Sequence, residues 1–279
     1  MLNEQENSYS ISVIITTFNR LNLLGRALSS LENQTFKDFE VIVSDDCSDV
    51  DVNDFLNKYK KDSQLTIRYR RNSENKGACY TRNEGIKIAR GKYIAGLDDD
   101  DEFTPNRLEM LLHAYNSKFS FVSSNTLVIE KQGSKRLFKS EREISLSNVL
   151  WANNVGTQVF VERDRILKIG GFDTNLSSAQ DADMWIRLIE QYGTALRLKD
   201  VTYILHTEHD MPRISTSNKK ISGMEGIYEK HKSKMSLSQR LFRKAQIKSY
   251  KNGTKLPLIY VQLIPEVFIY SIKRALRFL

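Results

Sequence analysis

Short apolar runs alternate with amphipathic segments along the first hundred residues. Four runs contain Val, Ile and Leu in short blocks and predict buried strands, at 11–18, 39–46, 65–71 and 92–97. Three segments between them carry apolar side chains at helical spacing and predict helices, at 19–34, 52–60 and 79–90. This alternation predicts an α/β fold with a doubly wound, mostly parallel sheet, in which ligands bind beyond the carboxyl ends of the strands.

The pattern changes in the second half of the chain. Residues 119–138 alternate between apolar and polar side chains on either side of a Gln-Gly-Ser turn, which predicts an antiparallel hairpin on the edge of the sheet. A later helix has a start signal at Ser177 or Ser178 and a stop signal at Gly193. Gly91 is expected to close the third of the earlier helices in the same way. Residues 1–9 are predicted to be an extension of a domain at 10–215.

Residues 216–279 are predicted to form a basic, partly apolar helical tail. One segment, 237–253, is a basic helix with three apolar residues on one face, Leu237, Leu241 and Ala245. The following segment, 256–279, is apolar for about seventeen residues but is interrupted by Gln262, Pro265 and Glu266. We expect it to lie at a membrane surface, with cations toward the lipid headgroups at Lys273, Arg274 and Arg277. A helical subdomain packed on the body, or an oligomer contact, is the alternative.

The net charge of +8 belongs to the tail. Residues 230–279 contain twelve Lys and Arg and one Glu, a charge of +11, so the rest carries 8 − 11, or −3. An acidic body argues against nucleic-acid binding. Two cysteines, Cys47 and Cys79, make no disulfide framework, and the polar N-terminus lacks the features of a signal peptide. These observations predict a cytoplasmic protein with a basic attachment segment.

The candidate chemistry begins where the strand at 92–97 runs into five carboxylates, Asp98 to Glu102. Neighbouring like charges repel, so such a run requires open water or a cation. Asp45 and Asp46 end another strand and are expected at the same edge of the sheet. The pattern predicts a Mg²⁺ or Mn²⁺ site in which the phosphates of a bound nucleotide complete the shell of the cation. The alternative is a solvated acidic loop that leads, through Glu102, into a helix at Thr104.

Five ordered motifs resemble those of family 2 glycosyltransferases, which are inverting enzymes with the GT-A fold. They read SVIITTFNR, VIVSDDCSD, NKGACYTRNEGI, GKYIAGLDDDDEFTPNRL and GGFDTNLSSAQDADMWIRL. The resemblance covers residues 10–215, about three-quarters of the chain. It implies a Rossmann-like, mostly parallel sheet with a small antiparallel edge, followed by the helical tail.

The resemblance also implies the residues of the donor site. The nucleotide would be bound by Thr17, Phe18, Asp45, Asp46, Gly77, Arg82, Asp98 and Asp99. Among these, Asp46 would meet a uracil edge, Arg82 the phosphates and Asp99 the ribose. The cation would be held by Asp98 and Asp100 with His209, for which His206 is the second choice. Many relatives carry Tyr at position 18 and Gly at position 47, so the turn at Cys47 is expected to differ.

The catalytic base implied by the resemblance is Asp181. An inverting transfer requires one carboxylate, ionised at the working pH, within reach of the acceptor hydroxyl. Asp181 also follows Ser178 by three residues, so a capping-box role at the helix start is the alternative. The acceptor would be bordered by Gly156, Thr157 and Trp185, although a place in the hydrophobic core is the favoured alternative for Trp185.

The function implied is transfer of a single sugar from a UDP-sugar to an acceptor hydroxyl. The expected acceptor is a polyprenyl-diphosphate- or lipid-linked saccharide in O-antigen, capsule or lipooligosaccharide synthesis, at the inner face of the cell membrane. The processive signature Gln-x-x-Arg-Trp is absent from the sequence. Two rivals are a nucleotidyltransferase, whose Gly-rich loop after the first strand is missing, and a non-catalytic nucleotide-sugar binder, which need not keep both the aspartate motif and the base.

Overall fold

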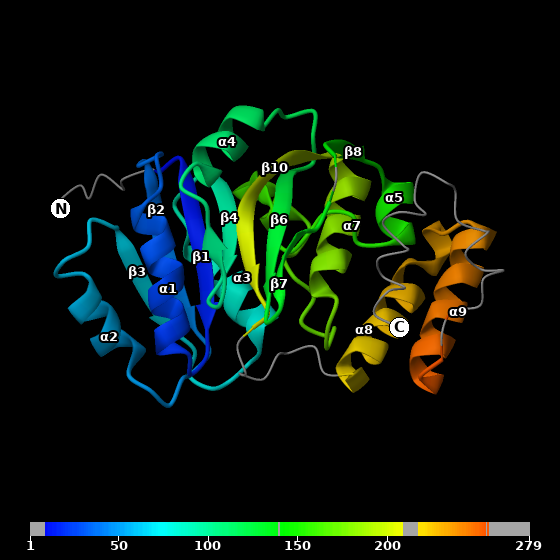
Figure 1. The fold of residues 1–279 in the computed structure, drawn as a ribbon, viewed down its shortest axis with the longest axis horizontal. Coiled ribbons are helices and arrows are strands. Elements are labelled where there is room, and N and C mark those ends of the chain that lie inside the picture. The colour runs from blue at the N-terminus through cyan, green and yellow to red at the C-terminus, as the bar shows by residue number, and fades with distance from the viewer. Residues whose placement is uncertain (1–8, 139, 209–216, 255, 257–279) are drawn as a thin grey trace.

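A computed structural model of the protein describes residues 9–138, 140–208, 217–254 and 256. The described strands form one sheet and are β1 (Ile11–Thr17), β2 (Phe39–Asp45), β3 (Ile67–Arg71), β4 (Tyr93–Asp98), β5 (Glu102–Phe103), β6 (Val122–Glu130), β7 (Gly133–Arg136), β8 (Arg142–Ile144), β9 (Phe160–Glu162) and β10 (Ala195–His206). Their order is β3-β2-β1-β4-β9-β6-β10-β5, with β7 paired to β6 and β8 paired to β10 (Figure 1). The predicted α/β class is confirmed.

The long strands of the sheet pair in parallel. Strands β3, β2, β1 and β4 are all parallel to one another, and β6 is parallel to β10. The antiparallel pairs involve the short strands β5, β7, β8 and β9. The sheet is therefore mostly parallel with small antiparallel additions, as the sequence predicts.

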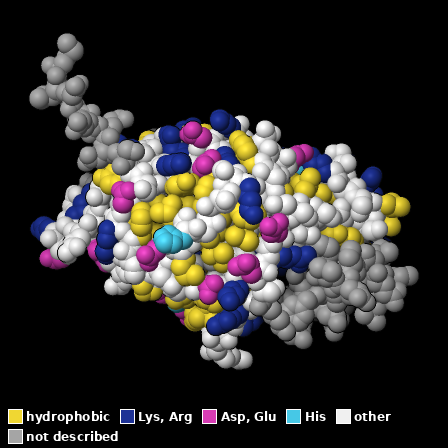
Figure 2. Space-filling model, turned by 90° about the horizontal axis from the view of Figure 1, so that it is seen from above, with side chains coloured by type: hydrophobic (Ala, Val, Ile, Leu, Met, Phe, Trp, Pro, Cys, Tyr) yellow, Lys and Arg dark blue, Asp and Glu magenta, His cyan; other side chains and the backbone are white. Residues whose placement is uncertain are grey.

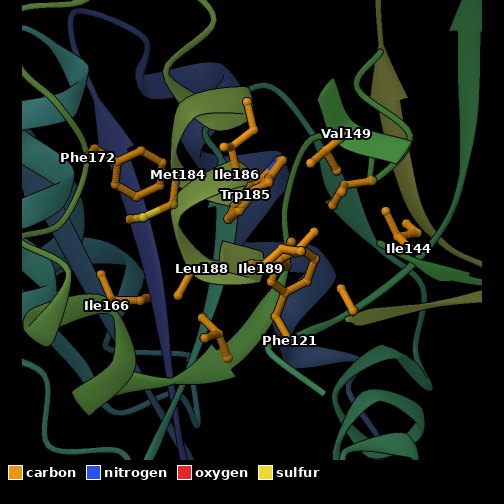
Figure 3. Close-up of a cluster of buried hydrophobic side chains, with 14 of the residues drawn as sticks. Phe121, Ile144, Val149, Ile166, Phe172, Met184, Trp185, Ile186, Leu188 and Ile189 are labelled. Carbon is orange, nitrogen blue, oxygen red and sulfur yellow. The ribbon is translucent and has the colours of Figure 1, made fainter. Parts of the chain in front are cut away.

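Helices pack on both faces of the sheet. They are α1 (Leu21–Glu32), α2 (Val52–Tyr59), α3 (Ala78–Ile88), α4 (Arg107–Ala114), α5 (Leu146–Trp151), α6 (Arg163–Lys168), α7 (Gln180–Tyr192), α8 (Ser217–His231), the 3₁₀ helix η1 (Lys232–Lys234) and α9 (Leu237–Asn252). Successive side chains of β1 alternate, so Val13 joins a core with α1, α2 and α4, while Ile14 joins a second core with α3 and α7. Figure 3 shows the second core, in which Met184 and Trp185 of α7 lie among Phe121, Phe172 and other apolar side chains.

Two predicted boundaries are wrong. Helix α3 ends at Ile88, and Gly91 lies beyond it, where a Cβ would come within 2.4 Å of the backbone nitrogen of Ser12. Glycine is therefore required at position 91 by the close approach to β1. It is not required to end helix α3. Glu102 lies in β5, which pairs with β10, and is not part of the start of α4.

The predicted hairpin at 119–138 is confirmed as β6 and β7. Its position on the edge is only half right, because β6 lies inside the sheet between β9 and β10. In the face shown in Figure 2, side chains of Lys and Arg lie among those of Asp and Glu over the described body.

The tail begins with three described helices, α8, η1 and α9. Trp151 of α5 packs on Phe242 of α9 with ring centroids 5.6 Å apart. Ala245 is buried as well, whereas Leu237 and Leu241 are 69% and 43% exposed, so these leucines do not share its packing face. No helix among the described residues combines the length and the apolar character needed to cross a bilayer. The predicted interfacial segment, from 257 onward, lies outside the described residues, as do residues 1–8 of the predicted extension.

Candidate active site

The residues predicted to bind the donor meet at one edge of the sheet. Thr17 of β1 pairs with Asp45 of β2, and Thr16 of β1 pairs with Asp98 of β4. Phe18, directly after β1, is 42% exposed at the same edge. Because parallel strands end together, residues far apart in the sequence come to lie side by side.

Asp46 organises the loop that leads into α3. Its carboxylate accepts hydrogen bonds from the backbone N–H groups of Lys76 and Gly77, at 2.8 Å each, and from the side-chain amide of Asn72 at 2.7 Å. A carboxylate offers about four acceptor positions. Three bonds within the chain therefore leave room for a further donor, such as a nucleobase N–H.

Asp45 is a buried carboxylate that hydrogen-bonds to residues around this edge of the sheet. It is fully buried, and its Oδ1 accepts hydrogen bonds from the backbone N–H and the hydroxyl of Ser48, at 3.0 and 2.6 Å. Its Oδ2 accepts a hydrogen bond from the Tyr69 hydroxyl at 2.9 Å. Cys47 in this turn has a φ of 65°, the left-handed conformation that glycine adopts readily. The turn thus keeps the conformation that glycine favours, although a cysteine occupies the position.

The N-terminus of α3 opens onto the same edge. Gly77 precedes the helix with a φ of 84°, and a Cβ at this position would meet open space. The first N–H groups of a helix and its positive dipole end attract anions such as phosphates. Arg82 extends from the same helix, so a nucleotide diphosphate would find backbone donors and a guanidinium together.

Arg82 and Gln158 converge on Asp98. Arg82 Nη2 lies 3.1 Å from Asp98 Oδ1, and Gln158 Nε2 donates a hydrogen bond to the same oxygen at 2.9 Å. The guanidinium also stacks on Phe172, with its carbon 4.8 Å from the ring centroid. Burial raises the pKa of Asp98, against the opposing charge of Arg82, and repulsion from Asp100 raises it further.

Gly96 makes the contact of Gln158 possible. A Cβ on Gly96 would lie 1.9 Å from Gln158 Oε1, so any larger residue in this part of β4 would displace the amide. A glycine is therefore needed at position 96, within YIAGLDDDD, because a side chain there would clash with Gln158. Gln158 was not predicted as a site residue, because it lies next to the predicted acceptor residues but contacts Asp98 only through tertiary packing.

Arg20 bridges the next two aspartates of the loop. Its Nη1 lies 3.3 Å from Asp99 Oδ1 and 3.2 Å from Asp100 Oδ2. Burial raises the pKa of Asp99 to about 7, although Arg20 acts in the opposite direction. Arg20 was also missed at the level of sequence, where its signal was its place at the end of the first motif, SVIITTFNR.

Asp101 joins the aspartate loop to β10. It is 2% exposed and accepts hydrogen bonds from the Tyr203 hydroxyl at 2.8 Å and from the backbone N–H of His206 at 2.9 Å. The ring of His206 lies between two carboxylates, with Nε2 2.7 Å from Glu102 and Nδ1 2.6 Å from Glu208. His209, the first choice for a metal ligand, lies outside the described residues.

The aspartate loop suits a divalent cation in its chemistry. No group of three His, Cys, Asp or Glu side chains in the described part of the chain is arranged to hold a metal by itself. In nucleotide sites, Mg²⁺ takes one or two carboxylates and completes its shell with phosphate oxygens and water. Asp98 and Asp100 provide hard oxygen atoms of this kind. The raised pKa values of Asp98 and Asp99 mean that burial disfavours the ionised form of these carboxyl groups. A cation bound beside them would stabilise that form.

Asp181 lies in the first turn of α7. Within the described structure, no hydrogen bond or ion pair reaches its carboxylate. Burial raises the pKa of Asp181 to about 6, with Arg82 opposing the shift and Asp98 adding to it. These charges place Asp181 in electrostatic contact with the donor-side residues. The capping-box alternative is not realised, because Ala179 caps α7 without a side-chain bond and Ser178 instead donates to the carbonyl of Lys219.

A buried network holds α7 in place. Asp183 is fully buried and accepts hydrogen bonds from Arg187 Nε at 2.7 Å and His231 Nε2 at 2.9 Å, while Lys230 Nζ lies 2.8 Å away. Arg187 also donates to the carbonyl oxygens of Ile169 and Gly171. The helix that carries Asp181 is therefore fixed from both the GGFD loop and α8.

The predicted acceptor residues have different surroundings. Gly156 has a φ of 113° and accepts a hydrogen bond from the Asn153 amide at 3.1 Å, while the hydroxyl of Thr157 has no hydrogen-bond partner among the described residues. Trp185 is 2% exposed and packs against Phe121, with ring centroids 5.4 Å apart. The expected contact of Trp185 with an acceptor sugar is therefore wrong, since the indole belongs to the core (Figure 3).

Two curated proteins are similar to the chain. The putative colanic acid biosynthesis glycosyl transferase WcaA of Escherichia coli (strain K12) is 34% identical over 258 residues, which cover 85% of this chain and 87% of WcaA. The GalNAc(5)-diNAcBac-PP-undecaprenol beta-1,3-glucosyltransferase of Campylobacter jejuni is 32% identical over 187 residues, which cover 65% of this chain and 60% of that enzyme.

Solved structures share the fold at low sequence identity. S. aureus TarS 1-349 in complex with UDP-GlcNAc superposes with a TM-score of 0.63 at 18% identity, covering 96% of this chain and 88% of that one. The mannosyltransferase PcManGT from Pyrobaculum calidifontis, in complex with GDP-Man and Mn²⁺, also gives 0.63 at 14% identity, covering 98% and 82%. The expected GT-A fold is thereby confirmed. The sequence profile of Glycosyl transferase family 2 matches residues 12–165, more than half of the chain. The protein therefore belongs to glycosyl transferase family 2.

Proposed function

We propose that this glycosyltransferase transfers one sugar from a UDP-sugar to a hydroxyl of a lipid-linked saccharide, with inversion at the anomeric carbon. The observation that carries the proposal is the carboxylate of Asp181, which has no bonding partner among the described residues and a pKa raised to about 6. It faces the charges of Arg82 and Asp98 at the carboxyl edge of the sheet. A base that is ionised near neutral pH and free to accept a proton suits this reaction.

In the proposed step, Asp181 accepts the proton of the acceptor hydroxyl as the oxygen attacks the anomeric carbon. The bond between that carbon and the diphosphate oxygen breaks on the opposite face, and UDP leaves with the electron pair. Arg82 and the N-terminus of α3 stabilise the negative charge that develops on the diphosphate. Asp46 has an acceptor position left for the uracil edge, and the exposed ring of Phe18 offers a stacking surface.

A divalent cation, Mn²⁺ or Mg²⁺, is part of the proposal, with Asp98 and Asp100 as its protein ligands. When bound, it would supply Lewis-acid stabilisation of the diphosphate leaving group. Arg20 forms ion pairs with Asp99 and Asp100 in the described structure. PcManGT, which shares the fold, was solved with Mn²⁺. His209 remains a proposed ligand outside the described residues.

The donor and the acceptor are proposed by analogy with relatives. TarS, which shares the fold, was solved with UDP-GlcNAc, and the Campylobacter jejuni relative is described as acting on an undecaprenol-diphosphate saccharide. WcaA is described as a colanic acid biosynthesis enzyme. We propose synthesis of a bacterial surface polysaccharide such as O-antigen, capsule or lipooligosaccharide. Residues 10–215 would carry the transfer, and residues 216–279 would hold the enzyme at the cytoplasmic face of the membrane.

The test is a panel of nucleotide-sugars with an undecaprenyl-diphosphate-linked acceptor, followed by release of UDP and by mass spectrometry of the product. We expect transfer from a UDP-sugar, loss of turnover when the metal is chelated, and recovery with Mn²⁺ or Mg²⁺. Asp181→Asn is expected to lower the rate of transfer about 100- to 10,000-fold while it leaves UDP binding intact. Glu190→Gln, at an exposed position of the same helix, is the matched control.

The same assay separates the two rival functions. A nucleotidyltransferase would release pyrophosphate from a nucleoside triphosphate and a sugar phosphate. A non-catalytic binder would bind UDP-sugar in calorimetry but release no UDP with any acceptor. Either result, obtained with the full panel, would contradict the proposed transfer.

A further inference from the structure

Helix α9 leaves two leucines outside the core. Leu237 and Leu241 are one helical turn apart and are 69% and 43% exposed, and they account for two of the five large hydrophobic side chains exposed in the described structure. The packing face of α9 is a different one, on which the Gln239 amide donates to the carbonyl of Ser147 in α5 and Phe242 packs on Trp151 of the same helix. The two leucines therefore contribute nothing to the core of the protein.

Cations surround these leucines. A groove of about 450 Å³ between α8, η1 and α9, which we call the α9 groove, is lined by Tyr228, Lys232, Ser233, Leu237, Arg240, Leu241 and Lys244. Arg240 Nε donates to the carbonyl of Met235 at 3.1 Å, and Lys244 Nζ lies 5.8 Å from the ring centroid of Tyr228. Lys232 pairs with Glu229. The stems of these long side chains extend the apolar surface, while their charges remain in solvent.

The charge around the groove is strongly one-sided. Residues 217–256 contain eleven Lys and Arg against two Glu, a net charge of 11 − 2, or +9. Residues 1–229 together carry −3, so the positive charge is concentrated at one end of the molecule, where α8 and α9 lie far from α2 (Figure 1). Exposed leucines next to clustered cations are complementary to a surface that is anionic outside and apolar beneath.

We propose that the α9 groove docks the protein on an anionic phospholipid bilayer. Leu237 and Leu241 enter the boundary between headgroups and acyl chains, while Arg240, Lys244 and Lys232 engage lipid phosphates. The proposal rests on the proposed function, because a lipid-linked acceptor lies in such a bilayer. It adds the part of the chain that makes the contact, which is described structure rather than the apolar segment from 257 onward.

The helices of the groove are joined directly to the helix that carries the base. His231 Nε2, at the end of α8, donates a hydrogen bond to Asp183 of α7 at 2.9 Å, and Lys230 Nζ lies 2.8 Å from the same carboxylate. η1 follows immediately and opens the groove with Lys232. A bilayer bound at the groove is therefore connected to Asp181 through one helix end and one buried carboxylate, which sets the orientation of the active site relative to the membrane.

The experiment uses the full chain and 100 nm vesicles of phosphatidylglycerol and phosphatidylcholine mixed, or of phosphatidylcholine alone, in a flotation assay. We expect binding to the anionic vesicles that falls with salt. Arg240→Gln with Lys244→Gln is expected to weaken it about 30-fold, since each cation near an anionic surface contributes about a five-fold factor. Leu237→Gln with Leu241→Gln is expected to weaken it about 10-fold. Lys60→Gln with Lys61→Gln, two exposed lysines after α2, is the charge-matched control and is expected to bind as wild type does.

Four results would overturn the proposal. The first is that the wild-type chain binds neutral and anionic vesicles equally well, and the second is that the control variant loses as much binding as the groove variants. The third is that both groove variants bind anionic vesicles as wild type does. The fourth is that the chain binds an oligonucleotide more strongly than it binds vesicles. UDP binding and transfer to a water-soluble acceptor analogue are measured in parallel. A groove variant that no longer binds vesicles but still transfers sugar to the soluble analogue supports the α9 groove as the docking surface and leaves the proposed function intact. A chain that docks but transfers no sugar refutes the proposed function and leaves the docking surface standing.

Discussion

Arg82 and Asp98 form an ion pair of 3.1 Å at the carboxyl edge of the sheet, one from a helix and one from a strand end. Their side chains are 12% and 31% exposed, so the pair faces the site but is partly shielded from water. Gln158 donates to the same Asp98 oxygen. This pair connects the predicted phosphate-binding residue to the predicted metal-binding loop, and the first prediction concerns it.

Arg82→Ala is expected to raise the KM for the UDP-sugar about 10- to 100-fold. The change removes a charge-assisted bond and the guanidinium that would meet the diphosphate, and such bonds contribute about 1.5–3 kcal/mol. Steady-state kinetics and calorimetry with UDP would measure the effect. Arg90→Ala, at an exposed position just beyond the same helix, is the control and should leave KM unchanged. Equal KM values for both variants would exclude a donor contact for Arg82.

The pH profile of kcat/KM is expected to rise with an apparent pKa near 6 and to level off above it. Asp181 must be ionised to accept a proton, and burial raises its pKa to about 6. Below that pH the carboxyl is protonated and cannot serve as the base. Asp181→Asn is expected to lower kcat about 100- to 10,000-fold. A wild-type profile that is flat between pH 5 and 8 would argue against Asp181.

Asp181→Asn is also expected to stabilise the fold at neutral pH, by about 3 kcal/mol. The folded pKa of about 6 lies above the ordinary value of 3.8, so the charged form is disfavoured in the folded state. This destabilisation is absent below pH 3.8, grows as the pH rises toward 6 and is complete above it. Urea unfolding of both proteins from pH 3.5 to 8 would measure the difference. A variant less stable than wild type at pH 8 would show that Asp181 supports the fold.

Asp183→Asn is expected to have the opposite sign and to cost about 2 kcal/mol at neutral pH. Burial disfavours the Asp183 charge, but His231, Lys230 and Arg187 together lower its pKa to about 2. The stabilisation is present above pH 3.8 and is lost as the pH falls through 2. An unfolding series extended from pH 8 down to pH 1.5 would show the two proteins converge as the pH falls from 3.8 through 2. A constant difference across the series would mean that packing, and not charge, accounts for the loss.

Gly96→Ala is expected to reduce activity by displacing Gln158 from Asp98. The added Cβ would lie 1.9 Å from Gln158 Oε1, and because the far end of a flexible side chain can move, the cost in stability is about 1 kcal/mol, the low end for overpacking. In the double variant Gly96→Ala with Gln158→Ala, the steric conflict is gone, so stability should recover while activity stays at the level of Gln158→Ala alone. Additive losses of stability in a double-mutant cycle would contradict a direct contact.

The periodicity of the sequence by itself determined the architecture around the site. Blocks such as 11–17 and 39–45 carry apolar side chains on both faces, which indicates a strand covered on two sides, and their polar ends must then meet at one edge. The placement of Asp46, Gly77, Arg82 and Asp98 at that edge follows from this alternation, which is local and strong. The role of Gly91 did not follow, because a glycine beyond a helix and a glycine against a neighbouring backbone look alike in sequence.

Tertiary structure alone decided which side chains serve the site and which serve the core. Arg20 and Gln158 join the aspartates across 79 and 60 residues of sequence, and no local pattern encodes such distances. Asp181 and Asp183 differ by two positions, yet among the described residues Asp181 has no bonding partner and Asp183 has three, because a helix turns them toward different neighbours. Trp185 lies in the core for the same reason. Helical geometry and packing therefore separate residues that the linear chain presents as equivalent.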